Sequence, residues 1–333
     1  MTIALILFAV LAVLAAVLYG VTRYFYRYAM ERRPESHTDW WTVDPSSIPG
    51  PEKQYGPEHL REYIYEKKLW LRREYEARGR EYSILSEDGL RLYGHYIPPA
   101  GEMRGVFLQV HGYRSNGFND FCGAVGHMTR DGFGCLVVDQ RCHGRSEGDT
   151  ICFGVRERYD ILLWCRFLEK EFPGMPVILD GVSMGAATVM GAASLELPEN
   201  VRGIIADCGY TSMEDIFRKV LATSFRLPAF PLLPLAELYC RLKNGFGFSD
   251  LRSEESLAHA KVPVLLAHGE ADDFVPYAMA VKIYETVRDK IDIEFVSVRD
   301  AGHGLSYLIN YDQYYAALCR LYDTLPDPRK EHS

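Results

Sequence analysis

The stretch LDGVSMGAAT, residues 179–188, places a serine between two glycines in the pattern G-x-S-x-G, formed by Gly181, Ser183 and Gly185. Glycine makes up about 7% of average sequences, and with serine about as common the pattern arises by chance in roughly one chain in ten of this length. The pattern alone therefore only suggests a nucleophile. The alternative is a run of small residues where a strand meets a helix, so the surrounding sequence must decide.

The residues on either side of Ser183 favour the nucleophile. The apolar run PVILD (176–180) precedes it and indicates a strand, and MGAATVMGAASL (184–195) follows it and indicates a helix. A strand, a tight turn and a helix are the setting of a nucleophile elbow, in which small flanking residues make room for the turn. The first backbone N–H groups of the helix would face negative charge that develops beside the serine.

Short apolar runs recur from about residue 81 and predict the fold class. The stretch 81–98 alternates around residues 87–89 and predicts a hairpin. Six further runs predict strands: 105–110, 133–139, 176–180, 201–207, 262–268 and 293–298. Most are separated by helix-length segments. Buried strands that alternate with helices predict a mostly parallel sheet with helices on both faces, and the hairpin would add an antiparallel edge.

A gap of about fifty residues, 211–260, interrupts this alternation of strands and helices. It contains RLPAFPLLPLAELYC (226–240), which is too apolar for a free loop and too rich in proline for one straight helix. We predict a small helical cap here. Phe230 and Leu233 are expected to form an apolar wall of the substrate pocket beside Ser183.

A serine hydroxyl needs a base and an acid that orients the base before it can act as a nucleophile. In an open α/β sheet these groups lie in loops at the carboxyl ends of strands. Asp272 follows one predicted strand and is the candidate acid, with Asp273 and Glu270 as close rivals. His303 follows the next strand and is the candidate base. The order serine, acid, histidine is the one expected for an elbow of this type.

The candidate oxyanion hole combines two backbone N–H groups, those of Tyr113 in HGYRSN (111–116) and of Met184. Other polar residues near the predicted strand ends are interpreted as braces of the site. They are His111, His268, and the three residues Asp139, Arg141 and His143 of DQRCHGRS (139–146).

These blocks together resemble the α/β-hydrolases, in the branch of serine-aminopeptidase-like and esterase-like proteins. The matching blocks run from about residue 81 to 325 and are SEDGLRLYGHYIP, VHGYRSN, VVDQRCHGRSEG, DGVSMGAAT, HGEADDFVP and AGHGLSY. The resemblance implies an α/β-hydrolase fold with Ser183 as nucleophile, Asp272 as acid and His303 as base. Membrane-anchored bacterial members of this branch open with a similar apolar segment.

The chain begins with such a segment, IALILFAVLAVLAAVLYGV (3–21), which is 19 residues long and uncharged. A helix of this length just spans the hydrocarbon core of a bilayer. Four arginines follow it: Arg23, Arg27, Arg32 and Arg33. A cleaved signal peptide is the rival, but basic residues would then precede the run. We predict a retained single-pass anchor over 1–28, with the hydrolase domain in the cytoplasm, and expect residues 1 to about 33 to add nothing to the chemistry.

Two segments lie between the anchor and the predicted sheet. Residues 29–57 are rich in proline and are expected to form a linker. Residues 58–80 are expected to form a charged amphipathic helix, which leaves 81–325 for the hydrolase domain.

Composition excludes several other classes of protein. The formal net charge is -8 and no basic stripe is present, so we expect no nucleic-acid partner. The eight cysteines show no C-x-x-C spacing, and we interpret them as buried thiols of a reducing compartment. No phosphate-binding or zinc-binding motif is present, so we expect neither a cofactor nor a metal.

Three functions fit these observations. The first is a serine hydrolase that cleaves carboxylic esters, on lipid-like or acylated molecules near the membrane. The second is an aminopeptidase-like or oligopeptide-cleaving serine peptidase, with a short peptide as substrate. The third is a non-catalytic membrane-tethered binding protein, against which the complete set of nucleophile, base and acid argues. A peptidase that binds a free amino terminus needs clustered acids, and those of the predicted cap are scattered, as Glu214, Asp215 and Glu237. The ester is therefore favoured.

Overall fold

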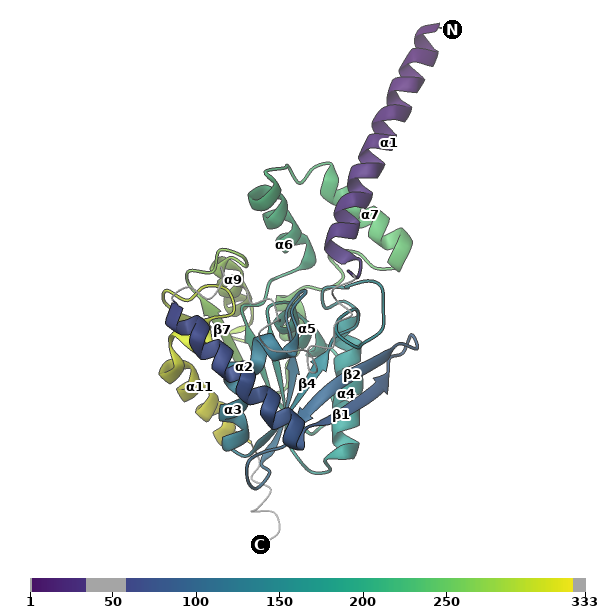
Figure 1. Ribbon diagram of the computed structural model, residues 1–333. Coiled ribbons are helices and arrows are strands. Elements are labelled where there is room, and N and C mark those ends of the chain that lie inside the picture. Colours follow the sequence, from purple (N-terminus) through teal and green to yellow (C-terminus); the bar gives the residue numbers. More distant parts are fainter. Residues whose placement is uncertain (1, 34–57, 326–333) are drawn as a thin grey trace.

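The computed structural model describes residues 2–33 and 58–325, so most of the predicted linker lies outside the described residues. An eight-stranded sheet forms the centre of the molecule, in the order β1-β2-β4-β3-β5-β6-β7-β8 (Figure 1). The strands are β1 (Arg80–Leu85), β2 (Arg91–Ile97), β3 (Gly105–Val110), β4 (Phe133–Asp139), β5 (Val177–Val182), β6 (Val201–Asp207), β7 (Val264–Gly269) and β8 (Ile293–Val298). Each apolar run that predicts a strand forms one.

The hairpin β1–β2 joins the sheet antiparallel, through β2 and β4. All pairings from β4 to β8 are parallel. The carboxyl ends of these strands therefore meet at one edge, where the loops that carry the candidate site residues emerge. The predicted fold class, a mostly parallel sheet with helices on both faces, is confirmed.

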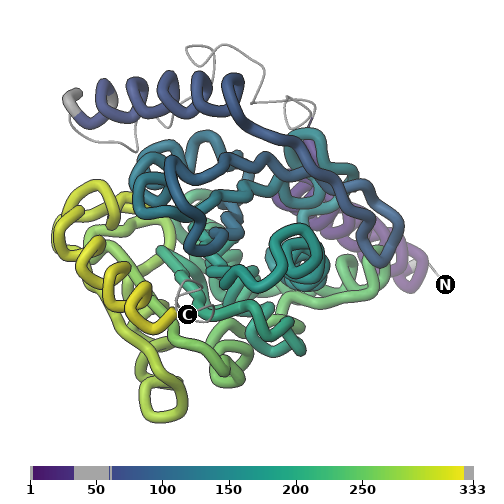
Figure 2. Tube along the Cα trace, turned by 90° about the horizontal axis from the view of Figure 1, so that it is seen from below, coloured from purple at the N-terminus to yellow at the C-terminus, as the bar shows by residue number. Residues whose placement is uncertain are grey.

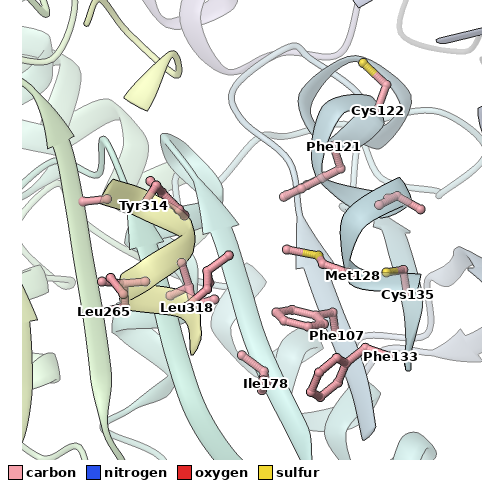
Figure 3. Close-up of a cluster of buried hydrophobic side chains, with 14 of the residues drawn as sticks. Phe107, Phe121, Cys122, Met128, Phe133, Cys135, Ile178, Leu265, Tyr314 and Leu318 are labelled. Atoms are coloured by element: carbon pink, nitrogen blue, oxygen red, sulfur yellow. The ribbon is translucent and has the colours of Figure 1, made fainter. Parts of the chain in front are cut away.

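Helices cover both faces of the sheet, and β3 to β7 are therefore buried almost throughout. One face packs against α2 (Glu58–Arg78), α3 (Gly117–Arg130) and α11 (Tyr311–Asp323), and Figure 3 shows the aromatic and aliphatic side chains of this layer. Within it, α2 is the outermost helix and lies along α3 (Figure 2). The other face packs against α4 (Glu157–Glu171), α5 (Met184–Ala192), α8 (Ser253–Leu257) and α9 (Tyr277–Val287).

The predicted cap contains α6 (Met213–Val220), the single π-helical turn η3 (Leu221–Phe225) and α7 (Leu232–Asn244). These elements lie above the carboxyl edge of the sheet (Figure 1). They share a third apolar cluster with the loop around Phe153 and with the C-terminal end of the first helix, α1 (Thr2–Met30).

Helix α1 runs beside α7 and then leaves the body of the molecule (Figure 1). Among the described residues it is the one helix whose length and composition suit a membrane span, with a mean hydropathy of 2.8 in its most apolar part. Side chains from Ile3 to Val17 are exposed, whereas Tyr26 and Met30 are buried. The two ends of α1 therefore have different surroundings.

Candidate active site

Ser183 lies in a strained turn between β5 and α5, with φ 57° and ψ −114°. A positive φ is rare for a residue with a side chain and is found mainly where the surroundings enforce it. Close backbone contacts leave no room for a side chain at Gly181 or at Gly185. A Cβ on Gly181 would lie 2.3 Å from the carbonyl oxygen of Gly185, and one on Gly185 would lie 1.8 Å from that of Val110. The G-x-S-x-G pattern is thus explained by the packing of this turn.

The structure brings Ser183, His303 and Asp272 into one hydrogen-bonded chain. His303 Nε2 lies 2.8 Å from Ser183 Oγ, and His303 Nδ1 lies 2.7 Å from Asp272 Oδ2. The second oxygen of Asp272 accepts hydrogen bonds from the backbone N–H groups of Phe274 and Val275, at 2.9 and 2.8 Å. These contacts fix the carboxylate, which in turn fixes the imidazole.

The two rival acids have different surroundings from Asp272. The side chain of Asp273 is exposed, and Glu270 accepts a hydrogen bond from Ser297 Oγ at 2.7 Å. Among the three acids of this loop, Asp272 is therefore the one that the structure pairs with His303.

Electrostatics keep Asp272 charged. Burial alone would raise the pKa of this carboxyl, but hydrogen bonds from His268 and His303 outweigh burial and hold the pKa well below its usual range. His268 Nε2 lies 3.2 Å from Asp272 Oδ2 and 2.9 Å from the carbonyl oxygen of Val275. The sequence indicated a structural role for His268 but no partner for it. Its contact with Asp272 could not be predicted from residue spacing alone.

The loop after β3 passes directly beside Ser183. A Cβ on Gly112 would lie 3.3 Å from the Cβ of Ser183, and the N–H of Gly112 donates to Asp120 at 2.7 Å. Tyr113, the next residue, and Met184, the first residue of α5, thus flank the serine on two sides. The N–H of Met184 has no partner within the helix, as is general for the first turn.

His143 supports this loop as a hydrogen-bond acceptor. Burial, together with nearby His111, lowers the pKa of His143 to about 3, so the imidazole is neutral at pH 7. Its Nε2 accepts a hydrogen bond from the N–H of Arg114 at 3.1 Å. Arg141 pairs with Asp160 at 2.7 Å and with Asp88, in the turn of the first hairpin, at 2.9 Å. These contacts agree with the interpretation of this segment as a brace.

Two cavities meet at Ser183. The larger, of about 830 Å³, lies towards α3 and α11 and also contacts His303, Asp180 and Tyr307. The smaller, of about 210 Å³, is apolar and lies under the cap, where Leu233 is one of its walls. Phe230 is not: its side chain is 77% exposed and lies outside both cavities. The expected apolar wall therefore exists, but Phe230 does not belong to it because the turn before α7 directs its ring outward.

The end of α1 is bonded to the loop beside Ser183. The hydroxyl of Tyr113 donates to the carbonyl of Ala29 at 2.8 Å, and the guanidinium of Arg114 donates to the carbonyls of Tyr28 and Glu31, at 3.0 and 2.9 Å. The last carbonyls of a helix need such donors from outside. The end of α1 therefore contacts the loop beside Ser183, while the expectation that residues 1 to about 33 add nothing to the chemistry stays a prediction.

One group of side chains has the spacing of a metal site within residues 2–33 and 58–325, namely Cys208, Asp272 and His303. Burial raises the pKa of Cys208 well above its ordinary value, so the sulfur is a protonated thiol and a poor ligand. His303 and Asp272 are bonded to each other through Nδ1 and Oδ2. This donor set suits proton transfer better than metal binding.

Residues 101–238 match the serine aminopeptidase family S33. An uncharacterised protein of Bacillus subtilis, YqkD, is 26% identical over 246 residues, which are 73% of this chain and 79% of that protein. The human monoglyceride lipase is 29% identical over 227 residues, which are 57% of this chain and 72% of the lipase. An esterase of Pyrococcus furiosus superposes with a TM-score of 0.61 at 18% identity, over 74% of this chain and 91% of the esterase.

The fold and the strand–turn–helix around Ser183 are those of an α/β-hydrolase. The chain therefore has the α/β-hydrolase fold, and it is similar to serine aminopeptidase-like and esterase-like proteins of that fold.

Proposed function

We propose that this protein is a serine hydrolase that cleaves carboxylic esters through an acyl-enzyme intermediate. The observation that carries the proposal is the continuous hydrogen-bond chain from Ser183 Oγ through His303 to Asp272, at 2.8 and 2.7 Å. A serine activated in this way, held in a strained turn at the meeting point of two cavities, is arranged for attack on a carbonyl carbon.

In the first half of the reaction, Ser183 Oγ attacks the ester carbonyl while His303 Nε2 takes its proton. Asp272 holds the imidazole in the required tautomer and stabilises the imidazolium that forms. The N–H groups of Tyr113 and Met184 donate to the oxyanion of the tetrahedral intermediate, and loss of one such donor typically raises the barrier by about 3–4 kcal/mol. The C–O bond to the alcohol then breaks, and His303 gives the proton to the departing oxygen.

In the second half, a water molecule replaces the alcohol. His303 takes a proton from this water as its oxygen attacks the acyl carbon, and the bond between the acyl group and Ser183 Oγ breaks. The proton returns to Ser183, and the carboxylic acid leaves. The overall reaction consumes one water for each ester and needs no cofactor.

The shape of the site favours an ester with an apolar acyl group. The cavity under the cap offers apolar walls to an acyl chain, whereas the larger cavity on the other side of Ser183 contains polar groups for an alcohol. The names of the similar proteins, a monoglyceride lipase and an esterase, agree with this class of substrate.

The peptidase alternative finds less support. Glu214 and Glu237 pair with Arg218 and Arg241 one helical turn away, at 2.6 and 3.0 Å. Asp215 accepts a hydrogen bond from Thr211 at 2.6 Å. The acids of the cap are therefore engaged with their own neighbours and do not form a site for a free amino group.

We also propose that α1 crosses a membrane and that the hydrolase domain is cytoplasmic. The length and hydropathy of α1 and the arginines that follow its apolar part support this orientation. Protease added to the outside of intact cells should leave the hydrolase domain uncut, and cleavage of that domain would refute this orientation.

A direct test compares hydrolysis of p-nitrophenyl esters of increasing chain length with hydrolysis of aminoacyl and peptidyl p-nitroanilides. We expect turnover of the esters, with a preference for medium or long acyl chains, and its loss in Ser183→Ala. Faster turnover of the anilides than of any ester would favour the peptidase instead.

A further inference from the structure

The cavity under the cap has α1 as one of its walls. Thr22, Phe25, Tyr26 and Ala29 line it, at the three- and four-residue spacing that places side chains on one face of a helix. Its other walls include Leu232 and Leu233 of α7 together with residues of α6 and η3, and Ser183 also contacts the same cavity. The pocket proposed for the acyl group is therefore built in part by the helix proposed to cross the membrane.

Packing holds α1 firmly in this position. The rings of Tyr26 and Tyr239 contact each other edge to face with centroids 4.9 Å apart, and those of Phe25 and Phe225 do the same at 4.9 Å. Asn244 donates to the hydroxyl of Tyr26 at 2.7 Å. Because α1 is tied to both α7 and η3, its lining residues are a fixed part of the cavity.

The same helix continues, without a break, into the exposed apolar segment from Ile3 to Val17 (Figure 1). The adjoining cap also carries exposed apolar side chains: Leu238 is 54%, Phe230 77% and Leu242 80% exposed. Contiguous apolar side chains on a soluble surface mark a contact with a partner or a membrane. If α1 crosses a membrane as proposed, the bilayer is the partner that suits the exposed apolar side chains of α1 and the adjoining cap.

We infer that α1 is part of the substrate site, and that the acyl chain of a bilayer lipid reaches Ser183 along the face formed by Thr22, Phe25, Tyr26 and Ala29. The inference rests on the proposed function, because Ser183 must cleave the ester that arrives. It commits to one occupant of the cavity, an acyl chain drawn from the membrane. The polar end of such a lipid would remain on the side of the larger cavity.

Labelling of Ser183 in the full chain, in vesicles of phosphatidylcholine and phosphatidylglycerol, tests this inference. The readout is the ratio of labelling rates for a long-chain and a short-chain alkyl fluorophosphonate. Ala29→Leu narrows the α1 side of the cavity, and Gly20→Leu is the matched control because a Cβ on Gly20 meets no atom within 4 Å. We expect the ratio to fall about tenfold in Ala29→Leu, as when one or two methylene groups no longer fit, and to stay unchanged in Gly20→Leu.

An opposite change gives the opposite expectation. Phe25→Ala widens the same wall, and the preferred alkyl chain should become longer. Wild-type ratios in both Ala29→Leu and Phe25→Ala would overturn the inference.

A second readout does not depend on catalysis. The Ser183→Ala variant is placed in vesicles that contain phosphatidylcholine with a photoreactive group near the end of one acyl chain. After illumination, crosslinks should appear on peptides that contain Ala29 or Leu233. Crosslinks confined to the exposed segment from Ile3 to Val17 would overturn the inference. Failure of both fluorophosphonates to label Ser183 would instead refute the proposed function, and the crosslinks would still decide whether an acyl chain enters the cavity.

Discussion

At the scale of single residues, the site depends on side chains whose immediate neighbours hold them in one geometry. Asp272 receives hydrogen bonds from two backbone N–H groups and contacts two imidazoles, whereas the adjacent Asp273 is exposed. The pair offers a matched comparison of two neighbouring acids.

Asp272→Asn should lower kcat by orders of magnitude, about 10⁴-fold by comparison with the same change in a well-studied protease, because the amide favours the wrong tautomer of His303. Asp273→Asn should leave kcat near the wild-type value. Steady-state kinetics on a soluble p-nitrophenyl ester measure both. If Asp273→Asn were the more damaged variant, the roles of the two acids would have to be exchanged.

Asp180, on β5, gives a prediction about pH and stability. Burial, with a smaller contribution from Asp207, raises its pKa from 3.8 to about 7, although Gln109 donates to it at 2.9 Å. A raised pKa in the folded state means that the fold favours the protonated acid. The stabilisation by this group is complete below pH 3.8 and is lost as pH rises through 7.

The wild type should therefore lose about 4 kcal/mol more than Asp180→Asn in free energy of unfolding between pH 4 and pH 8. Chemical denaturation of both proteins in detergent, at several pH values, measures the difference. Parallel curves for the two proteins would show that Asp180 ionises with an ordinary pKa.

At the scale of elements, α5, the loop after β3 and the cap meet around one serine. The cap contributes Leu233, which is only 5% exposed and lines the smaller cavity, while Phe230 on the preceding turn points to the outside. Substitutions can therefore be made at the cavity side or at the exposed side of this segment. Only those at the cavity side should alter the choice of substrate.

Leu233→Ala should shift the preferred length of soluble p-nitrophenyl esters towards longer acyl chains, because the truncation lengthens or widens the apolar pocket. Each additional buried methylene is worth about 0.8 kcal/mol, or roughly fourfold in the rate ratio. Phe230→Ala is the control and should keep the wild-type profile on these soluble esters. An equal shift in both variants would mean that the change acts through the cap as a whole and not through the cavity wall.

The sequence predicted the strands and helices well, and the three residues it singled out are ones that the structure brings together, for physical reasons. Strands buried on both faces appear as continuous apolar runs, and the contacts of Gly181 and Gly185 leave a recognisable signature beside Ser183. Asp272 and His303 follow strand ends, which the topology places at one edge of the sheet.

The direction of individual side chains was harder to predict. Phe230 and Leu233 are three residues apart in an apolar stretch, and only the turn before α7 decides which of them faces the cavity. The contact of α1 with the site joins residues more than 80 positions apart, as in the bond from Tyr113 to Ala29. Local periodicity carries no trace of such a contact, so α1 could be recognised as a candidate membrane span but its C-terminal part could not be recognised as a wall of the cavity.

At the scale of the whole molecule, the elements define one axis. The sheet presents its carboxyl edge to the cap, the cap packs on α1, and α1 leads away from the body (Figure 1). On this account, an ester enters from the side of α1, is cleaved at Ser183 and leaves as an alcohol and a carboxylic acid. Release of the alcohol and release of the acid are linked by one covalent intermediate, the acyl group on Ser183 Oγ.

The most direct test is therefore to trap that intermediate. The full-length protein is mixed with a medium-chain p-nitrophenyl ester, quenched in acid within the first turnovers, digested and examined by mass spectrometry. The account predicts the mass of the acyl group on the peptide that contains Ser183, and neither adduct nor turnover in Ser183→Ala. Undiminished hydrolysis by Ser183→Ala, or an acyl group on a different residue that is required for turnover, would contradict it.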